Sequence, residues 1–273
     1  RGRVMRRLLA LPLLFTLIGA SLPPARPPQR IVSLNLCADQ YLLALADRSQ
    51  IAALTQFARD PEMSAAAVAA RGVPFTRGSA EDVLALRPDL VIAAPFRRRT
   101  TMAQLRGRDI ATLDLEPAAN YAEIVEQVRA VAKAVGHPAR GEALIARMNA
   151  ALRRVSRDAG KGAIAAYYQR RGFLTGTGTL IDDLMRRVGL RNLAARLHKP
   201  PLARVGLEEM ARARPDYLIV ETGSEQVSDL GTELLQHPLL RSIHRLRLPQ
   251  SWTVCGGPAY VKAAQALAAQ LHP

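Results

Sequence analysis

The chain has 273 residues, of which 49% are apolar, 22% charged and 4% aromatic. This composition is typical of globular proteins and supplies a core for one large domain or two small ones. With only two cysteines, a disulfide-rich scaffold is excluded. The formal net charge of +15 suits an anionic ligand, an anionic surface or nucleic acid.

Residues 1–26 have the order of parts found in a secretory signal peptide. A basic run, RGRVMRR, precedes thirteen apolar residues, LLALPLLFTLIGA, and a proline-rich exit. A membrane-spanning helix would need about 20 apolar residues, so a permanent anchor is disfavoured. We expect cleavage between Ala20 and Arg26 and a mature protein that is soluble outside the cytoplasm. Secretion, together with the lack of helix-turn-helix or zinc-finger spacing, argues against a nucleic-acid partner.

Short β-rich runs alternate with helical patterns between residues 30 and 115. The predicted strands are RIVSLNL, IAALTQ, DLVIAA and IATLDL, and the predicted helices between them are ADQYLLALAD, MSAAAVAAR, AEDVLAL and MAQLRGR. This alternation predicts a mostly parallel sheet covered by helices.

Two helical stretches then follow each other, and alternation resumes after residue 160. The second stretch, residues 139–159, carries an apolar stripe at helical spacing and would form a rod about 30 Å long. One interpretation is a further surface helix; the other is a connecting helix between an N-terminal lobe, residues 27–138, and a C-terminal lobe, residues 160–273. We predict an α/β fold of two lobes with mostly parallel sheets and a ligand cleft between them.

A repeated phrase supports two similar lobes. GSAEDVLALRPDLVIA begins at residue 78, and VGLEEMARARPDYLIV begins at residue 205. In each copy a helix ends at Arg-Pro-Asp and a buried strand follows, and in the first copy Ser79 is the predicted N-cap. The two copies occupy matching places in their halves of the chain.

Loops at the carboxyl ends of parallel strands form the binding crevice of such sheets. Here they are rich in arginine, whose guanidinium group suits carboxylates and phosphates, although each arginine could equally be solvated. Trp252, beside two glycines, is predicted to form a cleft wall. The candidate ligand-binding residues are Cys37, Asp39, Arg59, Arg77, Phe96, Arg97, Arg98, Arg171, Phe173, Thr175, Trp252 and Cys255.

Catalytic motifs are not recognisable. There is no G-x-S-x-G, H-E-x-x-H or C-x-x-C motif, and the five histidines are scattered. We therefore expect no enzymatic activity, no catalytic residues, no cofactor and no metal ligated by the protein. A secreted α/β enzyme with an unrecognised site and a basic interaction module that binds a polyanion remain alternatives.

The sequence resembles the helical-backbone periplasmic binding proteins of ABC importers, which carry ferric siderophores, haem or vitamin B12. The resemblance covers residues 29–273 and rests on RIVSLNLCADQYLLALAD, GSAEDVLALRPDLVIA and LIDDLMRRVGLRN. It implies a monomeric periplasmic protein whose rigid lobes close slightly on the ligand and which then docks on a membrane permease. It also implies that Glu81 and Glu208 meet permease arginines, although both also suit the first turn of a helix.

The resemblance leaves the ligand open. Relatives that bind vitamin B12 line the cleft with aromatic residues, whereas Thr76, Ala94 and Leu202 occupy the matching places here. An iron(III)-siderophore-type chelate is therefore favoured over cobalamin, with haem as a further alternative. Cys37 and Cys255 belong to different lobes, so we expect unpaired thiols, although a bridge is possible.

Overall fold

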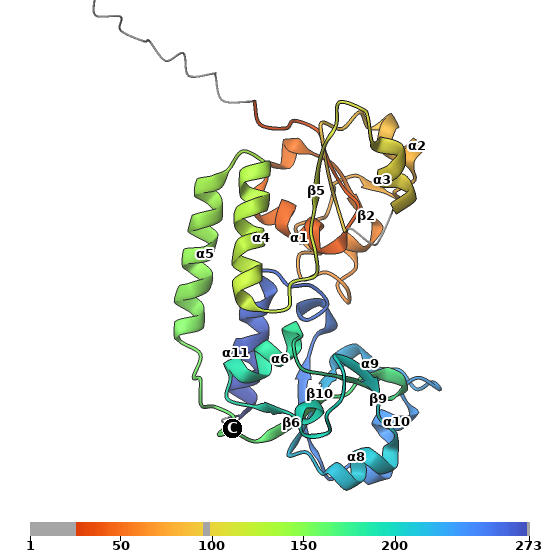
Figure 1. Ribbon diagram of the computed structural model, residues 1–273, viewed down its shortest axis with the longest axis vertical. Coiled ribbons are helices and arrows are strands. Elements are labelled where there is room, and N and C mark those ends of the chain that lie inside the picture. The colour runs from red at the N-terminus through yellow and green to blue at the C-terminus, as the bar shows by residue number, and fades with distance from the viewer. Residues whose placement is uncertain (1–25, 95–98, 272–273) are drawn as a thin grey trace, which may run out of the picture.

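The computed structural model describes residues 26–94 and 99–271. These residues form two α/β lobes, one above the other in Figure 1, with a pair of helices along one side. The sheets are mostly parallel, which confirms the predicted fold class. No helix in the described ranges has the length and apolarity to cross a membrane.

The N-terminal lobe is built on a five-stranded parallel sheet with the order β3-β2-β1-β4-β5. Its central strands are buried on both faces, as expected for a sheet covered by helices. The elements are β1 (Ile31–Ser33), α1 (Leu36–Leu45), β2 (Ile51–Thr55), β3 (Phe75–Thr76), α2 (Ala80–Ala85), β4 (Leu90–Ala93), α3 (Arg99–Leu105) and β5 (Ala111–Asp114).

The helix predicted for MSAAAVAAR is wrong. Residues 61–72 form successive turns instead. The N–H groups of Ala67 and Val73 donate three residues back, to Ser64 and Ala70, and a bond of the α-helical kind, four residues back, is made by Ala70 to Ala66 without being continued by its neighbours. Burial of Ala67, Ala70 and Val73 fixes this path in preference to the helix that an alanine-rich run favours.

The C-terminal lobe has a four-stranded parallel sheet, β11-β10-β6-β8, and an antiparallel pair, β7-β9, that the sequence did not reveal. Its strands are β6 (Ile164–Tyr167), β7 (Phe173–Thr175), β8 (Arg191–Asn192), β9 (Leu202–Arg204), β10 (Tyr217–Glu221) and β11 (His244–Leu248). Its helices are α6 (Leu180–Arg187), α7 (Leu193–Arg196), α8 (Leu207–Ala213), α9 (Thr222–Gln226), α10 (Glu233–Gln236) and α11 (Ala259–Leu271).

Helices α4 (Tyr121–Ala134) and α5 (Pro138–Arg153) lie side by side along one side of the molecule and lead from the upper lobe to the lower one (Figure 1). The region proposed as a connecting helix is thus helical to Arg153, and turns lead from there to β6. One apolar core includes Ile31, Val128, Met148 and Leu267, so it runs without interruption from the N-terminal sheet through α4 and α5 to α11. This continuity favours a stiff junction between the lobes.

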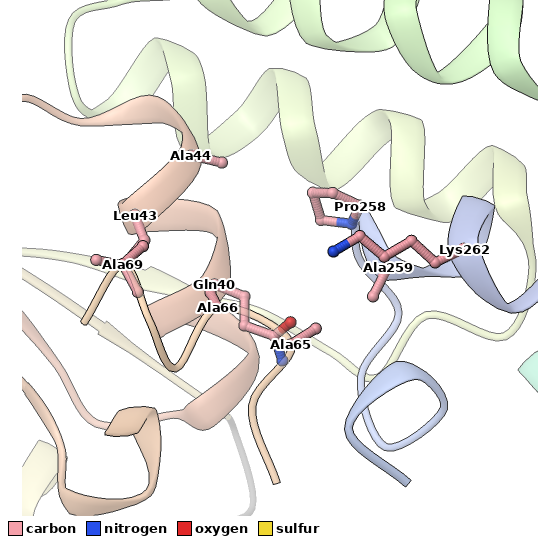
Figure 2. Close-up of a pocket in the computed structure, with 9 residues that line it drawn as sticks. All are labelled: Gln40, Leu43, Ala44, Ala65, Ala66, Ala69, Pro258, Ala259 and Lys262. Atoms are coloured by element: carbon pink, nitrogen blue, oxygen red, sulfur yellow. The ribbon is translucent and has the colours of Figure 1, made fainter. Parts of the chain in front are cut away.

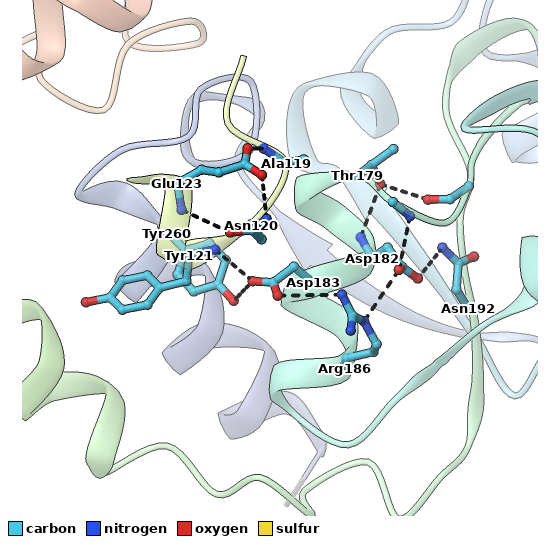
Figure 3. A network of polar contacts seen from close by, with 12 residues as sticks. Ala119, Asn120, Tyr121, Glu123, Thr179, Asp182, Asp183, Arg186, Asn192 and Tyr260 are labelled. Carbon is cyan, nitrogen blue, oxygen red and sulfur yellow. Dashed lines mark hydrogen bonds and ion pairs between the residues drawn. The ribbon is translucent and has the colours of Figure 1, made fainter. Parts of the chain in front are cut away.

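The start of α4 is also anchored to the C-terminal lobe by a polar network (Figure 3). Asp183 on α6 accepts hydrogen bonds from the Tyr121 N–H at 3.2 Å and from the Tyr260 hydroxyl on α11 at 2.7 Å. Arg186 lies 3.7 Å from the same carboxylate. A carboxylate at this junction therefore connects the connecting helices to two helices of the lower lobe.

The repeated phrase has a structural role in both lobes. The Ser79 hydroxyl accepts from the Asp82 N–H at 3.1 Å, which confirms the predicted N-cap of α2. At the other end of each copy, Arg87 and Arg214 adopt positive φ angles of 44° and 43°. This left-handed conformation ends α2 and α8, and the proline that follows prevents either helix from continuing.

The aspartate of each Arg-Pro-Asp then binds the first strand of its own lobe. Asp89 accepts from the Arg30 N–H at 2.9 Å, next to β1. Asp216 accepts from the Ile164 N–H at 2.7 Å, at the start of β6. In each lobe the repeated motif therefore ends a helix and anchors the strand that follows to the first strand of the sheet.

Candidate functional site

The candidate cleft lies where the carboxyl ends of the two parallel sheets approach each other. The segment after β2 extends toward the lower lobe (Figure 1), and it contacts that lobe directly. A Cβ added at Gly223, in the first turn of α9, would lie 2.7 Å from Glu62 Oε2. The Glu62 side chain of the upper lobe therefore reaches α9 of the lower lobe, and a larger residue at position 223 would require its carboxylate to shift.

On the N-terminal side, an arginine and two phenylalanines gather at the end of β2. The Arg59 guanidinium lies 5.2 Å from the centre of the Phe75 ring and donates to the Val73 carbonyl. Phe57 and Phe75 are 45% and 51% exposed, which is high for aromatic side chains. Arg77, also exposed, follows β3. This edge therefore offers cationic and flat apolar surface together.

The C-terminal lobe presents a similar pair after β6. The Arg204 guanidinium lies 5.7 Å from the centre of the Phe173 ring, and Leu202 beside it is 58% exposed. Arg171 is exposed at a positive φ of 58°, and Thr175 donates to Gln169 at 3.2 Å. Each lobe thus carries one arginine stacked on one phenylalanine. Sequence reasoning missed Phe75 and Arg204 because the β3 and β7-β9 strands were not predicted.

A buried polar network supports the C-terminal side. The Tyr167 hydroxyl donates to Glu221 Oε1 at 2.9 Å and lies 3.0 Å from the Thr253 hydroxyl, while Gln169 donates to the same carboxylate oxygen at 3.0 Å. Burial raises the pKa of Tyr167 well above its usual value, and the neighbouring Glu221 raises it further. The tyrosine therefore stays protonated and holds the ends of β6 and β10 to the loop after β11.

Trp252 lies in that loop, between β11 and α11. Its ring is partly exposed and packs against the continuous core. It is the single tryptophan of the chain, so its fluorescence reports on this loop alone. Its placement is compatible with the predicted cleft wall, which stays a prediction.

The prediction that Asp39 contacts ligand is wrong. Asp39 is fully buried, and its carboxylate accepts from the Thr55 N–H at 3.1 Å and the Thr55 hydroxyl at 2.5 Å. Burial raises its pKa to about 6, and the hydrogen bonds from Ser33 and Thr55 limit the rise. Asp39 therefore fastens α1 to the end of β2 and does not face the cleft.

The expectation of unpaired thiols is also wrong. Cys37 and Cys255 form a disulfide with Cα atoms 5.3 Å apart. The sequence separation of 218 residues hid this proximity, which arises because the loop before α11 returns to the N-terminal end of α1. Neither sulfur is available as a metal ligand, and the bridge joins the two lobes next to the cleft.

Other contacts seal the same junction. The Tyr41 hydroxyl, on α1, donates to the Gly256 carbonyl at 2.5 Å and lies 3.0 Å from Gln127 on α4. A Cβ added at Gly256 would lie 2.6 Å from the Ala118 Cβ, so the loop approaches the N-terminal lobe as closely as a glycine permits. The disulfide is therefore one part of a tightly packed seam.

Three predicted residues, Phe96, Arg97 and Arg98, lie outside the described part of the chain. Glu81 and Glu208 occupy the first turns of α2 and α8, where both are exposed. Within residues 26–94 and 99–271, no group of three or more His, Cys, Asp or Glu side chains could hold a metal ion.

Comparison with known proteins agrees with this architecture. A family model described as "Periplasmic binding protein" matches residues 31–245. A curated relative from Halobacterium salinarum, named cobalamin-binding protein, is 26% identical over 214 residues, or 76% of this chain. The chain covers only 58% of that relative's length.

Two solved structures share the fold. The apo form of the periplasmic heme-binding protein RhuT from Roseiflexus sp. RS-1 has a TM-score of 0.73 at 24% identity, covering 89% of this chain and 98% of that one. A possible iron-binding, periplasmic solute-binding protein from Staphylococcus epidermidis has a TM-score of 0.73 at 13% identity, covering 91% and 100%. Because the family match spans most of the sequence, the chain belongs to the periplasmic binding protein family.

Proposed function

We propose that this protein is the periplasmic substrate-binding component of an ABC importer and that it captures an anionic metal chelate of the iron(III)-siderophore type. The observation that carries the proposal is the matching arginine–phenylalanine pair on each lobe, Arg59 with Phe75 and Arg204 with Phe173. Guanidinium groups bind carboxylates and other oxyanions, and phenylalanine rings pack on flat organic surfaces.

These groups recognise the outside of a chelate and do not ligate its metal. Arginine has no lone pair to donate to a cation, so the metal would arrive fully coordinated by its organic carrier. The strongly basic chain would raise the local concentration of an anionic ligand. The protein would act as a monomer. It would bind one chelate molecule and then dock on the permease in the inner membrane.

Cobalamin is a second candidate because the relative from Halobacterium salinarum carries that name. Heme is a third, because the protein from Roseiflexus that shares this fold is named for it. The three ligand classes differ in charge and absorption, so one experiment separates them.

The test begins with the mature protein purified from its own periplasm, whose native mass and visible spectrum identify a retained ligand. Trp252 fluorescence is then titrated with a ferric tricarboxylate siderophore, hemin and cyanocobalamin. We expect the ferric chelate to bind most tightly. Arg59→Gln and Arg204→Gln should each weaken it about tenfold, the cost of a charge-assisted hydrogen bond, whereas Arg147→Gln on the exposed face of α5 should not. Tighter binding of cyanocobalamin, with no loss in the arginine variants, would overturn the choice of chelate.

For permease docking we propose Glu81 and Glu208. Their positions at equivalent helix starts suit a partner with two similar halves. Glu81→Lys with Glu208→Lys should leave ligand affinity unchanged and abolish uptake in cells, while Glu126→Lys on α4 should leave both intact. Unimpaired uptake by the double variant would refute this role.

A further inference from the structure

A small cavity lies in the seam between the lobes, apart from the arginine–phenylalanine pairs. It has a volume of about 160 Å³ and is bounded by α1, the turns at residues 65–69 and the start of α11 (Figure 2). Most of its wall is apolar. The apolar lining residues are Leu43, Ala44, Ala65, Ala66, Ala69, Pro258 and Ala259.

Gln40 contributes a polar group to this wall. Its side chain is directed toward Pro258 and Ala259 (Figure 2), it is only 4% exposed, and its Nε2 has no hydrogen-bond partner among the described residues. Buried amides are nearly always paired, because an unpaired one loses its hydration without compensation. A donor left open beside a cavity indicates a missing acceptor.

Lys262 supplies charge at the same place. Side chains on a helix lean toward its N-terminus, and that of Lys262 extends back past Pro258 so that its nitrogen lies on the cavity side (Figure 2). It makes no ion pair with the described residues, and no carboxylate lines the cavity. The cavity also adjoins the start of the thirteen-residue helix α11, where the helix dipole favours negative charge.

From these features we propose that the seam cavity binds a short-chain aliphatic monocarboxylate. The carboxylate would accept from Lys262 Nζ and from the Gln40 amide, and the hydrocarbon chain would pack on Leu43 and the alanines. A cavity of about 150 Å³ accommodates a ligand of about six heavy atoms, which is the size of butyrate.

The surroundings give this cavity fixed walls. Gln40 lies one turn beyond Cys37 on α1, and Pro258 lies three residues beyond Cys255, so the disulfide holds the two sides of the cavity together. A carboxylate bound here would contact both lobes while leaving the cleft open to its own ligand.

The test uses the oxidised, chelate-free protein and sodium butyrate, followed by saturation-transfer NMR and calorimetry at constant ionic strength. Butylamine, which is cationic at neutral pH and nearly the same shape, is the matched probe. We expect saturable binding of butyrate and none of butylamine. Lys262→Met should weaken butyrate binding at least about tenfold, and Ala66→Leu should block it by filling the cavity, while Lys133→Met on α4 should have no effect.

None of the residues that line the cavity belongs to the arginine–phenylalanine pairs, so the variant that combines Arg59→Gln with Arg204→Gln should still bind butyrate with unchanged affinity. That result would stand even if the protein proved to carry a different chelate. Absence of saturable butyrate binding, equal binding of butylamine, or full affinity in the Lys262→Met variant would overturn the proposal.

Discussion

Removing the disulfide between the lobes should cost the protein a large part of its stability. The change is Cys37→Ala with Cys255→Ala, which deletes the bridge and leaves no reactive thiol. The bonded residues are 218 positions apart, and the loop-closure entropy of a ring of that length corresponds to about 5 kcal/mol at 25 °C. Domains are typically stable by only about 5–15 kcal/mol, so the loss would be severe.

The assay is urea unfolding followed by far-ultraviolet circular dichroism, on oxidised wild type, wild type in reductant, and the double variant. We expect the midpoint to fall by a similar amount on reduction and on mutation, since both remove the same constraint on the unfolded chain. Reductant should leave the double variant unchanged, which controls for unspecific effects. Non-covalent contacts such as Tyr41 to Gly256 should keep the native seam assembled, so the native spectrum should not change.

A loss of less than about 1 kcal/mol would refute this reasoning, because it would mean that the unfolded chain gains almost nothing from release of the ring. Two thiols titrating in the denatured, non-reduced protein would refute the bridge itself. The single substitutions Cys37→Ala and Cys255→Ala should each be as destabilising as the pair, because either one opens the ring.

Three further predictions concern single positions. Burial raises the pKa of Asp39 from 3.8 to about 6, so the contribution of this group to stability is fully present below pH 3.8 and is lost, by about 3 kcal/mol, as the pH rises through 6. Asp39→Asn should flatten this part of the stability–pH profile measured by urea unfolding, and an unchanged profile would contradict the prediction. Arg87→Gly and Arg214→Gly should each raise stability by about 0.5–1 kcal/mol, seen as a higher Tm, because glycine adopts their positive φ angles without strain; a lower Tm would show that the arginine side chains contribute more than their backbone costs. In Gly223→Ala, the added methyl group should displace the Glu62 side chain and change the ligand affinity measured by Trp252 fluorescence. Adding Glu62→Ala should restore the affinity, and failure of that rescue would show that the two residues do not meet in solution.

The sequence alone determined the parallel βα architecture of the two lobes, because the signals for it are local. Alternation of apolar runs with amphipathic helices predicts parallel βα lobes from neighbouring residues alone, without knowledge of long-range contacts. The stop at Arg-Pro-Asp depends on backbone geometry within three residues, and the Ser79 cap on a hydrogen bond to the next turn. Both could therefore be found without coordinates, as could the arginine-rich character of the strand ends.

Only the tertiary structure decided which of these side chains reach the cleft. Asp39 and Arg59 both follow predicted strands, yet one is buried against Thr55 and the other stacks on an exposed ring. Cys37 and Cys255 meet because the last loop returns to the first helix. Burial, stacking and pairing depend on distances between segments far apart in the chain, and a single sequence contains no record of those distances.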